Sequence, residues 1–449
     1  MRLPALVLVA ALALPSVPSA QAVTAFTNVS VVPMDRERVL ENQTVVVQGS
    51  RVIAMGPAGR TPVPAGAVRI EARGRYLMPG LGEMHAHIPG GQASPEMVDR
   101  VLFLFLANGV TTVRGMLGDP RHLELRDRAA RGEILSPAIH TSGPSINGNS
   151  APSVEVVQRM VAEQKAAGYD FIKIHPGLRR EVFDSMAAAA QRAGLTFSGH
   201  VPLEVGLERA LEAPYATIDH LDGYAEYLLD AGAPVSAAQS QFFGLNFGAY
   251  LDDSRIPQVA AATGRAGVWN VPTEILMENL AGDASVEQLL AREEIRYWYP
   301  AQVDQWVAAR RQFEQTPEAD RAAWINTRRT IIRRLHEAGA GLLLGSDAPQ
   351  MWNVPGFSAH RELEALVAAG LTPFEALETG TRNVAVFFRS TDSTGTVAVG
   401  KTADLILLDA NPLTDIRNSR RIHGVMVRGR WLSRAELDAG LARLAEKRG

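Results

Sequence analysis

The spacing of hydrophobic positions divides the chain into two kinds of region. Residues 23–76 and 394–432 contain short β-branched runs, among them residues 23–32 and 44–48, with turn-forming residues between them. Neither stretch shows the apolar spacing of an amphipathic helix. Residues 77–393 instead alternate apolar runs of strand length with helical segments. We predict one small β-sandwich domain built from both chain ends, and a separate α/β domain between them.

The number of strands in the middle region indicates its architecture. Its eight candidate strands end near residues 85, 112, 141, 173, 200, 220, 272 and 347. Several helical segments between them close with a glycine after the last helical residue, as at Gly109, Gly168 and Gly194. Eight strand–helix units favour a (β/α)8 TIM barrel over residues 77–393. The alternative, an open doubly wound sheet, would need a glycine-rich phosphate turn after its first strand, and the sequence has none there.

The first residues have the pattern of a targeting signal. Residues 1–22 contain a short apolar run followed by the small-residue cleavage pattern Ala20-Gln-Ala22. The run is shorter than the about 20 residues that cross a bilayer, so we expect no membrane anchor. A buried N-terminal helix is the alternative, which Pro4, Pro15 and Pro18 disfavour. We therefore predict a signal peptide and an exported protein, periplasmic or secreted.

Two further helical segments are expected. Residues 433–449 should form a C-terminal helix, because Ser433 and Glu436 have the spacing of a capping box. Residues 280–335 should form a helical insertion before the last strand of the barrel. This insertion either covers the mouth of the barrel as a lid or packs its aromatic residues into a core of its own; they are Tyr297, Trp298, Tyr299, Trp306, Phe313 and Trp324.

The composition removes several classes of function. The chain has 449 residues, no cysteine and a formal net charge of −3. Without cysteine it has no disulfide framework, no cysteine-ligated zinc and no thiol nucleophile. Without an excess of basic residues, nucleic acid is not an expected partner. The composition leaves the formation of a homo-oligomer open.

Candidate metal ligands stand at the ends of the predicted strands. His85 and His87 are two residues apart, so both side chains project from the same face of a strand. Imidazole is a common ligand for zinc and similar ions. Later strands end in further polar residues, which in chain order are Lys173, His200, His220 and Asp347. In a TIM barrel this edge of the strands carries the active site.

Strand alternation also assigns directions to individual charged residues. Lys173 should point into the barrel, where an unpaired charge is costly. It could reach solvent at the mouth, pair with a carboxylate, or react as a neutral amine with CO₂ to form a carbamate that bridges two cations. By the same rule Glu83 should face inward like His85, and Asp219 should face outward toward the helices.

These residues and their surroundings resemble the amidohydrolase superfamily in its binuclear metal form. The run Met78-Pro-Gly-Leu-Gly-Glu-Met-His-Ala-His87 resembles the first-strand signature of that superfamily. Residues 345–349, 355–364 and 400–412 resemble its imidazolonepropionase-like branch, which includes prolidase-like dipeptidases. The resemblance implies two divalent metal ions, with zinc as the expected metal. It places His85, His87 and Asp347 on one ion, His200 and His220 on the other, and carboxylated Lys173 between them.

The resemblance also implies a reaction. The enzyme would hydrolyse an amide bond in a dipeptide such as Xaa-Pro or in an N-acyl amino acid. The ions would activate a bridging hydroxide, and Asp347 would take its proton and pass it to the leaving nitrogen. A lactonase or esterase would use the same hydroxide and stays an alternative. A metal-free barrel that binds a partner is the non-catalytic alternative.

Four more residues are candidate substrate contacts. Arg114 could hold a substrate carboxylate with two hydrogen bonds or form a structural ion pair. Tyr224 is expected on a loop at the mouth, His140 near a strand end, and His360 at the start of the helix after Asp347. Each of these could instead be a packing or capping residue.

Overall fold

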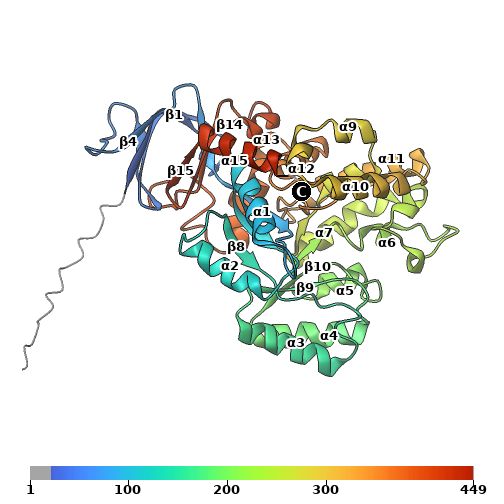
Figure 1. Cartoon of the computed structure of the whole chain (residues 1–449). Helices are drawn as coiled ribbons and strands as arrows, with labels where there is room; N and C mark the ends of the chain where they lie inside the picture. Colours follow the sequence, from blue (N-terminus) through green and yellow to red (C-terminus); the bar gives the residue numbers. More distant parts are fainter. Residues whose placement is uncertain (1–21, 448–449) are drawn as a thin grey trace, which may run out of the picture.

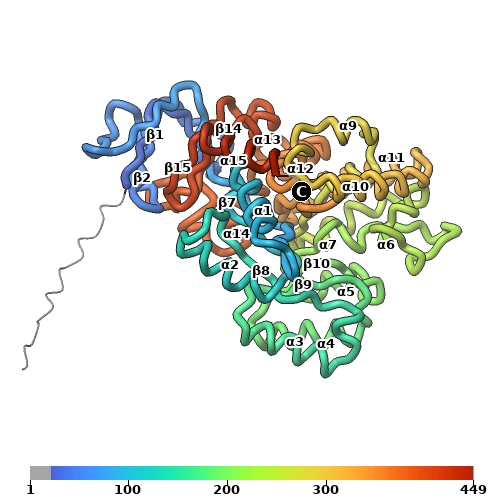
Figure 2. The backbone as a smooth tube through the Cα atoms, viewed as in Figure 1, coloured from blue at the N-terminus to red at the C-terminus, as the bar shows by residue number. Residues whose placement is uncertain are grey.

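A computed structural model describes residues 22–447. Apart from Ala22, the predicted signal peptide lies outside the described residues, so its prediction stays untested. Strands from the two chain ends lie side by side in one small domain, and the central part of the chain forms a larger α/β body (Figure 1, Figure 2). Within residues 22–447 no helix combines the length and hydropathy needed to cross a membrane.

The small domain joins eight strands into one hydrogen-bonded sheet, with the order β15-β14-β13-β5-β1-β2-β3 and β4 beside β1. The sheet folds over on itself, since β3 bridges Thr402 just before β13. Its inner face buries an apolar cluster that includes Phe26, Val45 and Leu405. β1 joins the two parts of this sheet, because it pairs with β2 along its whole length on one edge and with β4 and then β5 on the other edge. The strands are β1 (Val23–Val31), β2 (Leu40–Gln48), β3 (Arg51–Pro57), β4 (Val68–Glu71), β5 (Tyr76–Pro79), β13 (Leu405–Leu408), β14 (Ile422–Val427) and β15 (Arg430–Ser433).

The central body contains two parallel sheets whose edges meet. One has the order β6-β7-β8 and the other β12-β11-β10-β9. Isolated parallel bridges link Ser142 to Phe171, Asn270 to Leu342, and Ala86 to Ala348. The contacts therefore run in a ring through seven strands and residues 341–348, which we call the strand ring, although only the two sheets form continuous ladders. The strands are β6 (Leu81–Ala86), β7 (Val110–Gly115), β8 (Ala138–Thr141), β9 (Phe171–Ile174), β10 (Thr196–Gly199), β11 (Tyr215–Asp219) and β12 (Trp269–Val271).

Helices follow the strands along the chain. Gly168 and Gly194 end α3 and α4 in the left-handed conformation, as predicted. The helices of the central body are α1 (Pro95–Ala107), α2 (Arg121–Ala130), α3 (Val154–Ala167), α4 (Arg180–Ala193), α5 (Gly206–Glu212), α6 (Tyr224–Leu228), α7 (Ile256–Ala266), α8 (Glu274–Ala281), α9 (Val286–Leu290), α10 (Pro300–Phe313), α11 (Glu318–Glu337), α12 (Phe357–Ala368), α13 (Pro373–Gly380) and α14 (Arg382–Phe387). The C-terminal helix α15 (Arg434–Glu446) begins at Ser433 with both hydrogen bonds of the predicted capping box.

The helical insertion buries most of its aromatic side chains. Trp298 and Trp324 are almost completely buried, and the Trp298 and Trp306 rings stack at 6.1 Å. Phe242 meets Phe313 and Trp324 through ring contacts. These aromatic residues pack into the protein core together with residues outside the insertion, among them Phe242, Trp352 and Phe357, rather than into a core of their own. The lid role stays a prediction.

Candidate metal centre

The structure brings the six predicted metal ligands together at one end of the strand ring. They come from different segments: His85 and His87 from β6 and the residues after it, Lys173 from β9, His200 from the end of β10, His220 from the end of β11, and Asp347 from residues 341–348. The rings of His85 and His220 lie 4.4 Å apart, and those of His200 and His220 lie 4.8 Å apart. Four of the six residues are histidines, and their imidazoles form a continuous cluster.

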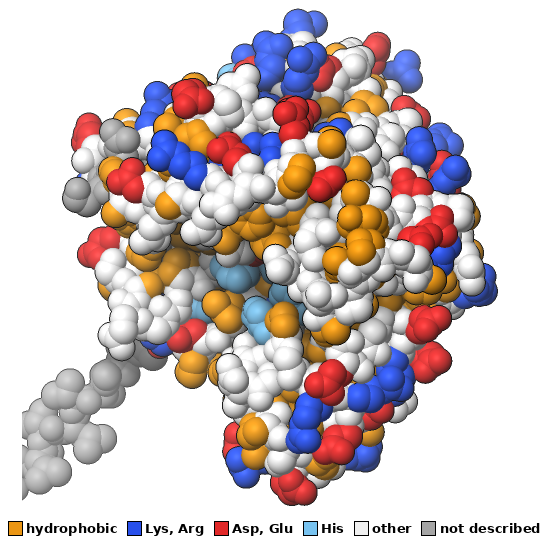
Figure 3. Space-filling model, turned by 90° about the vertical axis from the view of Figure 1, so that its right-hand side faces the viewer, with side chains coloured by type: hydrophobic (Ala, Val, Ile, Leu, Met, Phe, Trp, Pro, Cys, Tyr) orange, Lys and Arg blue, Asp and Glu red, His pale blue; other side chains and the backbone are white. Residues whose placement is uncertain are grey.

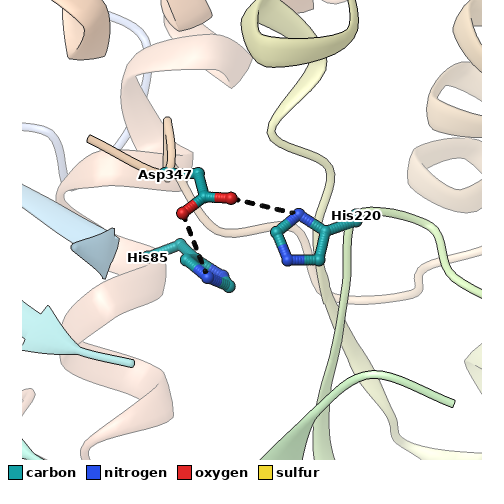
Figure 4. Close-up of side chains that lie close together, drawn as sticks. All are labelled: His85, His220 and Asp347. Atoms are coloured by element: carbon teal, nitrogen blue, oxygen red, sulfur yellow. Dashed lines mark ion pairs between the residues drawn. The ribbon is translucent and has the colours of Figure 1, made fainter. Parts of the chain in front are cut away.

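Asp347 forms ion pairs with both His85 and His220 (Figure 4). Its Oδ1 is 3.0 Å from Nε2 of His87 and 3.6 Å from Nε2 of His85. Its Oδ2 is 3.8 Å from Nδ1 of His220. One ligand atom from each of His85, His220 and Asp347 can be chosen so that all three lie within 4.8 Å of one another. This spacing suits a shared cation.

The backbone turns two of these side chains inward. His220 and Asp347 both have φ of +64°, a left-handed conformation that Asp and His tolerate better than most residues. In β11, Thr217 and Asp219 already face the interior, where their side chains hydrogen bond at 2.7 Å. Simple alternation would then send His220 outward. The left-handed turn at His220 is what lets two consecutive residues point into the ring.

The outward direction predicted for Asp219 is therefore wrong. Asp219 is fully buried, and its Oδ2 lies 3.2 Å from Nδ1 of His85 and 3.6 Å from Nζ of Lys173. Its Oδ1 is 3.4 Å from Nη2 of Arg114. The sequence does contain a signal for this direction. Thr217 and Asp219 are two residues apart with the apolar Ile218 between them, so strand alternation places the two polar residues on one face, opposite to Ile218. Asp219 is thus a site residue that the sequence analysis missed.

Burial lowers the pKa of the His85, His200 and His220 imidazoles and so favours their neutral form. Burial, followed by the nearby charge of Lys173, lowers the pKa of His200 to about 3. The same two causes hold the pKa of His85 well below its ordinary value. Burial also lowers the pKa of the Lys173 amine, while the carboxylates of Asp219 and Asp347 oppose that shift. A neutral imidazole has the free lone pair that a metal ion requires.

Hydrogen bonds fix the orientation of two of the rings. Nδ1 of His200 lies 3.0 Å from Oδ2 of Asp222, and Nδ1 of His220 lies 2.9 Å from Oγ1 of Thr273. A carboxylate or hydroxyl on one ring nitrogen leaves the other available to a metal, a common arrangement around protein metal sites. Neither Asp222 nor Thr273 was identified from the sequence.

Glu83 connects β6 to residues 341–348, two of the segments that carry the ligands. Its Oε1 accepts hydrogen bonds from the backbone N–H of His85 at 3.2 Å and of Ser346 at 2.7 Å, and its Oε2 accepts from Oγ of Ser346 at 2.7 Å. Glu83 faces inward, as its spacing from His85 predicts. Burial raises the pKa of its carboxyl to about 8. It holds β6 beside residues 341–348, so that His85 and Asp347 face each other.

Unpaired buried atoms show that the residues present fit a cation. Within residues 22–447, five buried atoms of this cluster make no hydrogen bond of good geometry, although they lie 3.0–3.6 Å from one another in ion pairs: Nδ1 of His85, Nε2 of His87, Nζ of Lys173, Oδ2 of Asp219 and Oδ1 of Asp347. Buried polar atoms without partners are costly and uncommon in folded proteins. Nitrogen and carboxylate oxygen donors are the ligands that zinc and similar divalent ions prefer. The donor set therefore fits divalent metal ions.

The structure does not place the four candidate substrate contacts at this centre's open side. Arg114 is buried, donates to the Met84 carbonyl at 2.7 Å and pairs with Asp219, so it has the structural role considered for it.

The other three candidates make contacts away from the metal ligands. The hydroxyl of Tyr224 hydrogen bonds to Thr263 at 2.9 Å inside the core. His360 is fixed by Ser419 and the Asn108 carbonyl, each at 2.9 Å, and His140 stacks on Phe388 at 3.9 Å. Since the polar atoms of Tyr224 and His360 are used within the core, the predicted substrate role of these two residues is wrong.

A cavity of about 770 Å³ opens beside the centre. Figure 3 shows histidine side chains at the bottom of a hollow whose walls are largely apolar or uncharged. His200 and Asp222 line the cavity, and Phe243 stands between it and the cluster, with ring contacts to His200 at 5.7 Å and to His220 at 5.1 Å. The exposed side chains of Glu208 and Arg180 lie at its rim. Its inner wall is apolar and buried, formed by Val201, Pro202, Val205 and Leu207.

The family is identified by a match over most of the chain. The sequence profile of the Amidohydrolase family matches residues 76–432. The chain therefore belongs to the amidohydrolase family, which confirms the resemblance and the class of enzyme it implies.

Solved structures support the same fold. Bottromycin amidohydrolase superimposes with a TM-score of 0.75 at 23% identity, covering 95% of this chain and 91% of that one. A candidate prolidase from Bifidobacterium longum gives a TM-score of 0.68 at 26% identity, covering 95% of this chain and all of the other. A Xaa-Pro dipeptidase solved with methionine in its active site gives 0.68 at 19% identity, covering 92% and 100%. Family and neighbours together imply a TIM barrel with a small additional domain.

Curated relatives match over a shorter stretch. An adenine deaminase of Ruegeria sp. (strain TM1040) is 28% identical over 199 residues, 39% of this chain and 31% of the deaminase. An adenine deaminase of Rubrobacter xylanophilus is 31% identical over 180 residues, 36% of this chain and 29% of the deaminase. The matched stretch thus spans roughly a third of the length of these relatives.

Proposed function

We propose that this protein is a binuclear metal-dependent amidohydrolase that cleaves the amide bond of a dipeptide, such as Xaa-Pro, or of an N-acyl amino acid. The observation that carries the proposal is the cluster of unpaired buried donor atoms around Asp347 and Lys173. The candidate prolidase at 26% identity supports the amide substrate.

The side chains divide the work as follows. His85, His87 and Asp347 would hold one divalent ion, zinc being the expected metal, and His200 and His220 the second, with Lys173 between them as a carbamate. Bound ions of this kind supply Lewis acidity and an activated water. Asp347 would accept a proton in the cluster and return it to the leaving nitrogen. Asp219 forms a buried ion pair with Arg114 and also contacts His85. Glu83 holds β6 beside residues 341–348.

The test is a metal and substrate survey of the purified protein. Elemental analysis is expected to find two divalent ions per chain, and Xaa-Pro dipeptides or N-acyl amino acids should be hydrolysed. Removing the ions with a chelator should abolish turnover, and zinc should restore it. Preferred turnover of a lactone, an aryl ester or adenine in the same panel would contradict the amide assignment. A metal-free protein that hydrolyses no compound of the panel would favour the binding-protein alternative.

We infer further that the cavity beside His200 receives the apolar part of the substrate. The inner wall of the cavity is apolar, and the candidate metal ligand His200 is one of its lining residues. Phe243 should contact both the histidine cluster and the apolar part of the substrate.

Phe243→Ala is expected to raise KM for N-acyl substrates with a bulky apolar acyl group by about tenfold or more, since burying one aromatic side chain contributes about 1.5–3 kcal/mol. N-acetyl substrates, which are too short to fill the cavity, should change much less. Steady-state kinetics on an acyl-length series measures both effects. Leu203→Ala is the matched control, because Leu203 lies on the exposed rim of the same cavity. Equal changes for short and bulky substrates would contradict the inference.

Export remains part of the proposal. The protein should lose residues 1–22 on passage out of the cytoplasm. N-terminal sequencing of the cell-fractionated protein tests this, and an intact N-terminus in the cytoplasmic fraction would contradict it.

A further inference from the structure

Thr273 occupies a helix-capping position without capping the helix. It precedes α8 as the N-cap residue, where a threonine hydroxyl usually accepts a hydrogen bond from the first turn. In the described part of the chain its side chain makes no such bond. Glu362 of α12 caps the helix instead, accepting from the N–H of Glu274 at 3.0 Å and of Ile275 at 2.7 Å. A second helix thus supplies the cap, and the Thr273 hydroxyl serves another partner.

That partner is His220. Oγ1 of Thr273 lies 2.9 Å from Nδ1 of His220 and 2.7 Å from the carbonyl oxygen of Pro272. A hydroxyl has one hydrogen to donate, and the shorter contact to the carbonyl uses it. With its hydrogen used there, Oγ1 would accept from His220, and Nδ1 would be the protonated nitrogen. A carboxylate oxygen, Oδ2 of Asp347, also lies 3.8 Å from Nδ1, which agrees with a donor at this position.

The surrounding residues hold Thr273 in an unfavourable backbone conformation. Its φ of +49° and ψ of +41° are left-handed, which is rare for a β-branched residue and is kept where the surroundings enforce it, often at functional sites. Arg328 donates to the carbonyls of His220 at 2.8 Å and Pro272 at 3.0 Å, and to Oε2 of Glu274 at 2.8 Å. The Arg328 guanidinium thereby holds the backbone of His220 and the two residues that flank Thr273 in fixed positions.

We propose that Thr273 is a positioning residue that holds His220 protonated at Nδ1 and so reserves Nε2 for a metal ion. This rests on the proposed function for the existence of the metal centre, but it concerns the metal-free protein as well. The hydroxyl selects one tautomer of a buried neutral imidazole before any ion arrives. An ion then binds without waiting for the imidazole to change tautomer.

The first test is spectroscopic and needs neither metal nor substrate. In the metal-free, ¹⁵N-labelled full-length protein, His220 is expected to show a protonated Nδ1 and an unprotonated Nε2, with its signals assigned by their absence from His220→Gln. A His220 protonated at Nε2 would overturn the proposal. The tautomer is read from the wild-type chain, so this test does not depend on the folding of any Thr273 variant.

The second test measures zinc affinity by titration of the metal-free protein. Thr273→Val keeps the β-branched shape but lacks the hydroxyl, and it should weaken zinc binding by about 10–100-fold, the usual effect of removing a partner of a metal ligand. Thr273→Ser restores the hydroxyl and should bind zinc close to the wild-type affinity. Thr263→Val, which removes another buried threonine hydroxyl with a 2.9 Å partner, is the control and should lower Tm without changing zinc affinity.

The possible results separate this proposal from the proposed function. Unchanged zinc affinity in Thr273→Val would overturn the positioning role, as would equal weakening in Thr263→Val. If instead the wild-type protein binds zinc with the expected tautomer but cleaves no amide, the proposed function fails while the role of Thr273 stands.

Discussion

Replacing Lys173 by alanine is expected to reduce amide hydrolysis to the detection limit while the protein still folds. Nζ of Lys173 is fully buried, has no hydrogen-bond partner within residues 22–447, and lies 3.6 Å from Oδ2 of Asp219. Alanine removes the proposed bridge between the two ions without overpacking the core. Asp219 keeps Arg114 as a partner at 3.4 Å, so its charge stays paired. Turnover and zinc content per chain measure the result.

Two additions sharpen the Lys173 experiment. Bicarbonate or a short carboxylic acid should restore part of the activity of Lys173→Ala by placing a carboxylate in the space left by the side chain. Lys165→Ala, on the exposed surface of α3, is the matched control and should behave like the wild type. Near wild-type turnover by Lys173→Ala with two ions bound would show that Lys173 is not the bridge.

Asp347→Asn should separate proton transfer from binding. Asparagine keeps the size of the side chain, tolerates the left-handed backbone at this position and still offers an oxygen. It cannot accept a proton as a carboxylate does. We expect kcat to fall by about 10²–10⁴, the usual contribution of general acid–base catalysis, with a small loss of metal and little change in KM. A large rise in KM at unchanged kcat would mean that Asp347 binds substrate instead.

Local patterns along the chain carry much of the architecture. The β-branched runs at both ends, the glycines that close α3 and α4, and the capping box at Ser433 depend on residues close in sequence. The spacing of His85 and His87 assigns both to one face in the same way. These features are decided within a few residues, so a reader of the sequence can predict them without knowing the fold.

Alternation failed where the backbone left the extended conformation. The rule assumes a regular strand, and the left-handed residue at the end of β11 allows Asp219 and His220 to face the same way. Tyr224 was expected at the mouth because it follows His220 closely, but the chain turns back and its hydroxyl meets Thr263 in the core. A single left-handed residue ends the regular alternation, so the directions of the side chains after it can no longer be counted from the strand.

By itself, the sequence determined the order of strands and helices, the six candidate ligands at the strand ends and the family. The tertiary structure decided which residues support those ligands. Thr273 reaches His220 across 53 positions, Asp222 reaches His200 across 22, and Ser346 reaches Glu83 across 263. Such contacts form only when the strand ring brings distant segments within hydrogen-bonding distance, about 3 Å. The periodic pattern of a strand or helix describes only its own segment, so it cannot predict which distant residues will meet.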